Sequence, residues 1–173
     1  TVPATAQTAP VMSNLRLWLD AADVNAGGAQ PANGAPITVW RDKSGNGYNA
    51  TASGSPSFES AGLNSRPSVR LAPGAKFSAP NIFTGSQSPQ TTMFVVQANI
   101  NPTTNFFTNL NGDTDATSGT TARFSTHSPW KPASATSPTF YFDAGACCGA
   151  TRLQHAYTVP LTQALMTATG NST

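Results

Sequence analysis

Short runs of apolar and β-branched residues recur along this chain, separated by clusters rich in Gly, Pro, Asn and Ser at 25–36, 73–80 and 111–119. Such runs are typical of β-strands, and no long segment keeps the 3.6-residue period of an amphipathic helix. Many short strands with frequent turns predict an all-β sandwich or barrel. The segment Leu161–Met166 is ambiguous between strand and helix. We expect strands at 15–19, 37–40, 68–71, 92–100, 105–110, 122–126, 139–143, 152–157 and 161–169, and one helical turn at 21–24.

Two similar motifs open the chain. Each places an Asp two residues after a Trp, in W-L-D at 18–20 and in W-R-D at 40–42. Asp accepts hydrogen bonds from N–H groups two or three residues further on, and Gly adopts the positive φ that a chain reversal needs. Asp20, Asp42, Ser44, Gly45 and Gly47 are therefore predicted to organise turns.

The same motifs resemble a known family. W-L-D-A at 18–21 and V-W-x-D-x-S-G-x-G-x-x-A-T at 39–51 are similar to the opening of laminin-G-like domains in the concanavalin A-like lectin/glucanase superfamily. The resemblance continues through 66–71, 93–96, 142–148 and 152–153, the later part being similar to bacterial surface-protein members. It implies an antiparallel jelly-roll β-sandwich, a fold that hosts lectins, adhesins, hydrolases and inert spacers.

Length and composition favour one exported domain. The 173 residues can bury a sizeable core, and residues 1–13 form a linker rich in Thr, Ala and Pro before a domain at 14–173. Only 9% of residues are charged, against about 25% in ordinary soluble domains, and abundant Thr, Ser and Asn suit an extracellular protein. Nine scattered basic residues form no stripe for a nucleic acid. Apolar runs are also shorter than the roughly 20 residues of a membrane span.

The end of the sequence departs from the family pattern. In the family, further strands follow the one that corresponds to 161–169, whereas this sequence stops at Thr173. A sandwich without these strands has an open edge. Three explanations remain: the protein continues, the fold is a shortened variant, or a neighbouring chain supplies the missing strand.

The two cysteines, Cys147 and Cys148, are adjacent. Their Cα atoms are about 3.8 Å apart across a trans peptide, below the usual disulfide range of about 4.4–6.8 Å, so a bond between them is strained. We favour such a vicinal disulfide. Free thiols, interchain disulfides and a metal site are the alternatives, the last lacking the usual ligand spacing.

Two polar residues, Asp143 and Arg152, flank the cysteines in sequence. One interpretation is a ligand-binding rim in which Asp143 and Arg152 hydrogen-bond sugar hydroxyls and the disulfide stacks on a sugar. The other is an Asp143–Arg152 pair that holds the loop. Trp130 lies between two prolines in a predicted loop and is a further candidate for stacking on a sugar, or closes the end of the sandwich.

Calcium is a candidate ligand, because lectin-like sandwiches often bind it at loop tips through oxygen atoms. Asn111, Asp113 and Asp115 form an oxygen-rich segment, although a solvated loop is the simpler interpretation. A cluster of Asp20, Asp23 and Asp42 is a second arrangement, for which turn capping is the preferred explanation.

Catalysis is poorly supported by the sequence. Glycoside hydrolases need two carboxylates about 5–9.5 Å apart, and the hydrolases of the family carry clusters such as E-x-D-x-x-E. This chain has a single Glu, Glu59, in a predicted loop, and its two histidines, His127 and His155, accompany no G-x-S-x-G element. The sequence therefore predicts a non-enzymatic protein.

The expected function is adhesion or carbohydrate recognition on a bacterial surface or appendage, with a glycan or cell-surface ligand as partner. One alternative is a structural subunit or spacer of a surface filament or coat, which binds copies of itself. Another is an accessory binding domain of a polysaccharide-degrading enzyme.

Overall fold

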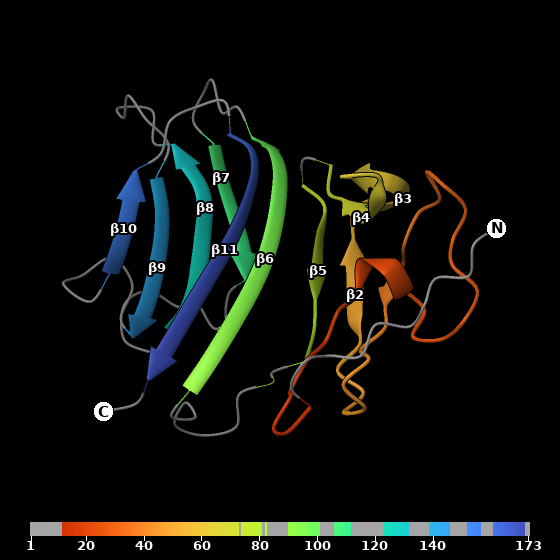
Figure 1. Cartoon of the computed structure of the whole chain (residues 1–173), viewed down its shortest axis with the longest axis horizontal. Helices are drawn as coiled ribbons and strands as arrows, with labels where there is room; N and C mark the ends of the chain where they lie inside the picture. Colours follow the sequence, from red (N-terminus) through yellow and green to blue (C-terminus); the bar gives the residue numbers. More distant parts are fainter. Residues whose placement is uncertain are drawn as a thin grey trace. The chain divides into compact units, whose positions relative to one another are not determined.

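The computed structural model describes residues 12–72, 74–80, 82, 90–100, 106–111, 123–131, 139–145, 152–156 and 161–171. In these residues the strand pairs are antiparallel, and the only helical element is a single 3-10 turn, η1 (Ala21–Asp23). The expected all-β class is thus confirmed, as is the helical turn (Figure 1). The chain divides into two compact units, an N-terminal unit (Thr1–Thr84) and a C-terminal unit (Gly85–Thr173).

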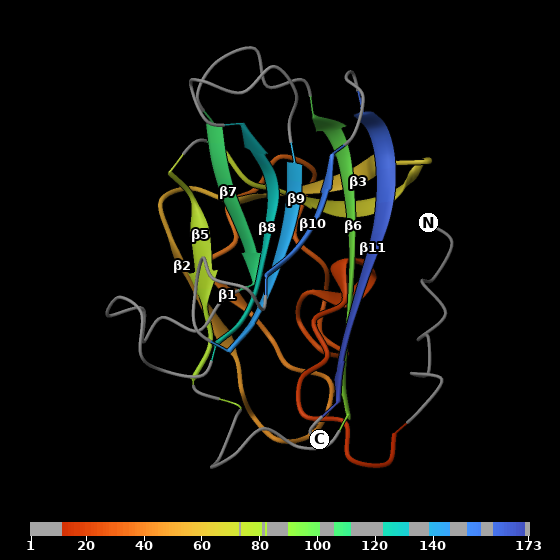
Figure 2. The same ribbon diagram turned by 90° about the vertical axis from the view of Figure 1, so that its left-hand side faces the viewer.

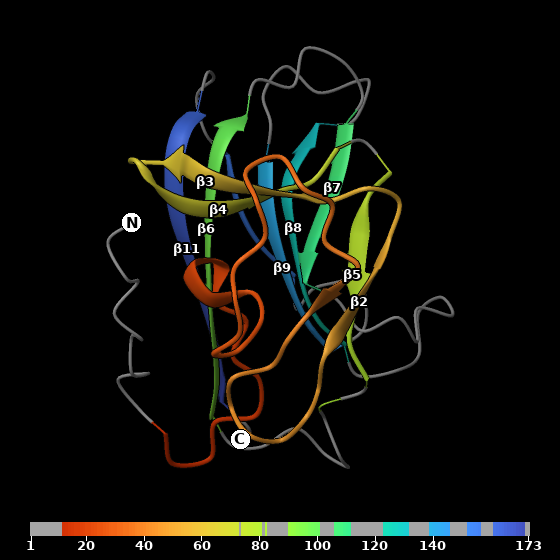
Figure 3. The same cartoon turned by 90° about the vertical axis from the view of Figure 1, so that its right-hand side faces the viewer.

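The N-terminal unit contains two small sheets, parts of which Figure 3 shows. One is three-stranded with the order β1-β2-β5, and the other is a β3–β4 hairpin. Asn64 and Ser65 connect the hairpin with φ values of 49° and 58°. Two consecutive positive φ values are typical of a type I′ turn, whose twist matches that of the flanking strands. The strands are β1 (Val39–Trp40), β2 (Ala50–Ser53), β3 (Ser57–Leu63), β4 (Arg66–Arg70) and β5 (Lys76–Ser78).

The core of the N-terminal unit is small and draws on both sheets. Val24, Ile37 and Phe58 are buried, with 0%, 4% and 3% of their surface exposed. Trp40 and Phe77 pack against this cluster, and their rings meet edge to face with centroids 5.5 Å apart. Aromatic pairs favour this geometry because the positive edge of one ring meets the negative face of the other. The core therefore joins Val24, which follows η1, to residues of the strands as far along the chain as β5.

The C-terminal unit also contains two sheets, which Figure 2 shows as separate elements. Strands β6 (Gln90–Ile100) and β11 (Leu161–Asn171) pair along almost their whole length as a two-stranded ribbon. The other sheet has the order β10-β9-β8-β7. Its strands are β7 (Phe106–Asn111), β8 (Arg123–Lys131), β9 (Thr139–Gly145) and β10 (Arg152–Ala156).

Several sequence expectations need correction. The segment expected to be a strand at 15–19 belongs to no sheet, because its backbone groups bond to the turn that follows β1. The sequence does not predict strands β2, β3 and β5. The Ala, Ser and Gly residues of β2 and β3 have weak strand propensity, and β5 lies in the turn-like segment at 73–80, so pairing decides their conformation. Glu59 consequently lies in β3 and Trp130 in β8, although the sequence predicts loops at both positions.

Phe58→Ala tests the core of the N-terminal unit. We expect the free energy of unfolding of this unit to fall by about 3–5 kcal/mol, because the change leaves a cavity between the two sheets. The measurement is denaturant unfolding of the full chain, followed by tryptophan fluorescence. Leu71→Ala is the control, because Leu71 is 51% exposed and its truncation should change stability by less than about 0.5 kcal/mol.

Candidate functional site

The strand register brings two of the predicted ligand-binding residues together. Asp143 of β9 lies directly opposite Arg152 of β10, and on its other side it faces Ser125 of β8. Directly opposed residues share one face of a sheet, with Cβ atoms about 4.5–5.5 Å apart. An acidic and a basic residue are therefore cross-strand neighbours, an arrangement that stabilises a sheet by about 0.2–1 kcal/mol.

A β-bulge places Trp130 on the same face. His127 pairs with Tyr141 and Trp130 pairs with Thr139, so three steps along β8 match two steps along β9. In a regular strand, residues three apart lie on opposite faces. The extra residue of the bulge instead returns Trp130 to the face of His127. Since Thr139, Tyr141 and Asp143 alternate along β9, Trp130 and Asp143 share this face.

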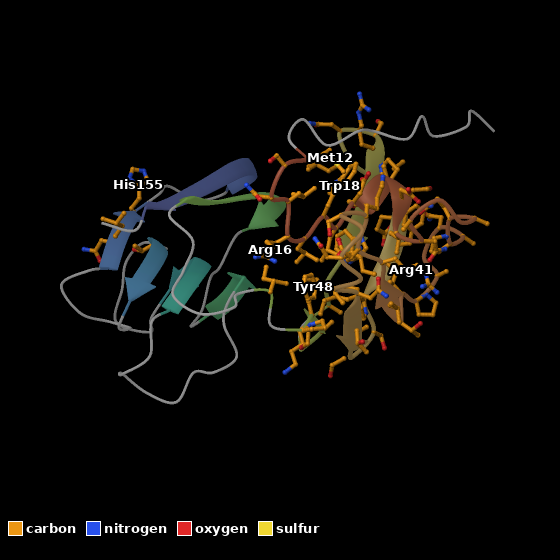
Figure 4. The ribbon with its side chains drawn as sticks, turned by 90° about the horizontal axis from the view of Figure 1, so that it is seen from below. Met12, Arg16, Trp18, Arg41, Tyr48 and His155 are labelled. Carbon is orange, nitrogen blue, oxygen red and sulfur yellow. The ribbon has the colours of Figure 1, made fainter. Side chains whose placement is uncertain are left out.

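We call this face the polar face of the four-stranded sheet. Its opposite carries mainly aromatic and aliphatic residues, including Phe124, Phe140, Phe142 and Leu153. His155, labelled in Figure 4, belongs to that opposite face. The register assigns to the polar face Phe107 and Asn109 of β7 together with Arg123, Ser125, His127, Trp130, Thr139, Tyr141, Asp143, Gly145, Arg152, Gln154 and Ala156 of the other three strands.

Of the other predicted site residues in the C-terminal unit, only Asn111 is among the described ones, and the register does not assign it to this face. Cys147, Cys148, Asp113 and Asp115 lie outside the described residues. Asn111 pairs with Thr126, which lies opposite Phe142 rather than Asp143. Among the described residues no group of three or more His, Cys, Asp or Glu could hold a metal ion.

A second polar cluster surrounds the carboxylate of Asp42 in the N-terminal unit. Its Oδ1 accepts hydrogen bonds from the backbone N–H groups of Trp18 at 3.0 Å and Ser44 at 2.8 Å. Its Oδ2 accepts from the Ser44 hydroxyl at 2.7 Å and the Tyr48 N–H at 3.0 Å. One side chain thus joins three chain segments, while Gly45 and Gly47 take the positive φ values that the turn requires.

The pKa of Asp42 follows from these bonds. Burial alone raises the pKa of this carboxyl, since it disfavours the charged form. The hydrogen bonds donated by Ser44, Trp18 and Tyr48 stabilise the charged form and outweigh burial, so the pKa lies below 3.8. Asp42 is thus a structural carboxylate that stays ionised, as turn formation requires.

Asp20 and Asp23 share a single cation, Lys43. The Lys43 Nζ lies 2.8 Å from Asp20 Oδ2, 3.1 Å from Asp23 Oδ2 and 4.3 Å from the centroid of the Trp18 ring. Burial lowers the pKa of Lys43, but the two carboxylates overcome this effect and raise it above 10.5. The pKa of Asp23 is raised by burial and lowered more by the Gly27 N–H and Lys43, so it falls below 3.8. The ammonium thus takes the place that a metal ion would have between these two aspartates.

Asp20 also caps η1 by accepting a hydrogen bond from the Ala22 N–H at 2.8 Å. The expected cluster of Asp20, Asp23 and Asp42 is therefore divided, because Asp42 lies in the other polar cluster.

Sequence reasoning missed Lys43 and Asn46 as parts of these clusters. The Asn46 amide donates to the Leu15 and Arg16 carbonyls, thirty or more residues earlier. Nothing in the local spacing of either residue indicates such distant partners.

Comparison with known proteins gives no relative for this chain: no family model, curated protein or solved structure matches it. Within the described part of the chain, no helix has the length and apolar character needed to cross a membrane.

Acid should weaken the N-terminal unit through Asp42 and Asp23. Because folding lowers both pKa values, their contribution is present above the unfolded value of about 3.9 and is lost as the pH falls through the folded values. The free energy of unfolding should therefore stay constant above about pH 5 and decrease below about pH 4.

Asp42→Asn should lower this free energy by about 1–3 kcal/mol at pH 7, because an amide cannot accept from all four donors, and should flatten the acid decline. Denaturant titrations between pH 2.5 and 7 in steps of roughly half a unit measure both effects. Glu59→Gln is the matched control, since among the described residues Glu59 accepts one long hydrogen bond, at 3.4 Å from Ser57. Equal acid profiles for Asp42→Asn and the native chain would contradict the assignment.

Lys43→Met keeps most of the aliphatic stem and leaves Asp20 and Asp23 without their shared cation. We expect a loss of about 1–2 kcal/mol at pH 7, between the values for exposed and buried ion pairs. The loss should shrink in acid, as the pH falls through the lowered pKa of Asp23 and that carboxylate takes up a proton. Because the pKa of Lys43 is raised, the native chain should lose the same contribution only above pH 10.5. Lys76→Met, at an exposed position of β5, should be neutral in the same unfolding measurement.

Proposed function

We propose that this protein is a non-catalytic carbohydrate-recognition or adhesion domain of a bacterial cell surface, and that the polar face binds the ligand. The observation that carries the proposal is the register of β8, β9 and β10, which gives Asp143, Arg152 and Trp130 one common face. These three residues were candidates on sequence grounds, and they come from separate strands of one sheet.

The composition of the polar face suits a saccharide. Sugars offer hydroxyl groups that bind charged and amide side chains, and apolar C–H faces that stack on aromatic rings. The face combines Asp143, Arg152 and Gln154 with the rings of Trp130 and Tyr141. A rigid sheet holds such groups at fixed spacing, which reduces the entropy lost on binding.

The proposal of a non-catalytic role rests on the carboxylates. Acid–base hydrolysis of a glycoside needs two of them at a suitable separation. Among the residues that the register assigns to the polar face, Asp143 is the only acidic one, and it lies opposite Arg152. A laminin-G-like jelly roll is the fold we propose for the whole chain, in keeping with its antiparallel sheets and its opening motifs.

Arg152→Ala and Trp130→Ala test this proposal. Each should lower affinity about tenfold or more for any glycan that the native chain selects from an array, because a charge-assisted hydrogen bond or a stacked ring is lost. Affinity is measured by titration calorimetry. His155→Ala is the matched control, since His155 is exposed on β10 but belongs to the opposite face. The glycan affinity of this variant should equal that of the native chain. Native affinity in both test variants, or no glycan bound by the native chain, would refute the proposal.

A further inference from the structure

Strand β10 forms a regular, exposed edge of the four-stranded sheet. It is the terminal strand in the order β10-β9-β8-β7, and no described strand lies on its outer side (Figure 1). Its five residues pair with β9 without interruption, and residues 153–156 are all exposed, with Leu153 at 66%. An edge strand directs alternate N–H and C=O groups outward, where they can pair with another strand.

The opposite edge of the sheet is different. Strand β7 shows two register shifts against β8, one on each side of Asn109. Bulges of this kind twist an edge and protect it from pairing. Strand β10 has no such irregularity, and its one residue with a fixed charge, Arg152, stands at its first position. Of the two edges, β10 is the one suited to accept a strand.

The sequence of β10 is complementary to itself in the antiparallel direction. When Gln154 is placed opposite Gln154 of a second copy, Leu153 faces His155 of that copy and Arg152 faces Ala156. No two arginines are opposed, so the repulsion that destabilises like-charged cross-strand pairs is avoided. The two central amides can hydrogen-bond to each other, since each carries both donors and an acceptor.

We propose that two copies of this chain pair through β10, with a twofold axis at Gln154, and so form one continuous eight-stranded sheet. A twofold axis of this kind runs perpendicular to the sheet, so the polar faces of both copies lie on the same side. If the proposed glycan function holds, the dimer presents two sites to one surface and gains avidity. The pairing itself does not depend on that function.

Engineered cysteines test the register. Opposed residues of an antiparallel pair have Cα atoms about 4.5 or 5.5 Å apart, and both values lie within the disulfide range. Gln154→Cys should therefore give a covalent dimer on mild oxidation, linked from residue 154 to residue 154 in peptide mass mapping. Leu153→Cys is the matched control. Its counterpart in the second copy lies about 8 Å away, too far for a disulfide, so peptide mass mapping should find no link from residue 153 to residue 153, but a link from residue 153 to residue 155 when Leu153→Cys and His155→Cys chains are mixed.

Light scattering of the unmodified chain over a concentration series provides the second measurement. Five paired residues give a small interface, so we expect a reversible dimer that forms in the micromolar range. Gln154→Lys, which opposes two ammonium groups, should raise the dissociation constant by up to about fivefold, while Gln154→Ala should change it less. A chain that stays monomeric up to roughly 0.1 mM would overturn the proposal. A dimer in which residues 154 fail to cross-link would overturn it as well.

Discussion

The ionised carboxylate of Asp42 is the interaction on which the N-terminal unit depends. Asp42 is buried, with 8% of its surface exposed, and its oxygens accept from groups at residues 18, 44 and 48. Buried backbone N–H groups need partners, and in this region a side chain supplies them in place of a sheet. The chain before η1 can therefore pack closely against the turn after β1 without becoming a strand.

Lys43 extends the same arrangement by joining Asp20 and Asp23 beneath the face of Trp18. Trp40 donates from its indole to the Asp20 carbonyl at 3.1 Å and meets Phe77 in the core. The polar clusters and the apolar core thus share residues from the same two opening motifs. The acidic residues of these clusters are engaged in hydrogen bonds and ion pairs within the N-terminal unit. The ligand-binding proposal therefore concerns the C-terminal unit.

In the C-terminal unit the comparable constraint is strand register. A shift by one residue moves every side chain of a strand to the other face. The bulge in β8 makes such a shift locally, and without it Trp130 would lie on the face of Phe140 and Phe142. Arg152 belongs both to the polar face and to the start of the β10 edge, so the proposed ligand site and the proposed dimer contact adjoin each other.

The sequence by itself determined the all-β class, eight of the strands at least in part, the helical turn and the turn-forming character of Asp20 and Asp42. These features depend on local periodicity and on hydrogen bonds between near neighbours. Tertiary structure decided which residues share a face, where Lys43 finds its carboxylates, and that the segment at 15–19 is not a strand. Weak strands such as β2 and β3 also needed it, since their Ala, Ser and Gly residues become extended only when a partner accepts their hydrogen bonds. Such features depend on groups distant in sequence, and a bulge or an ion pair between distant segments leaves no periodic signal in the chain.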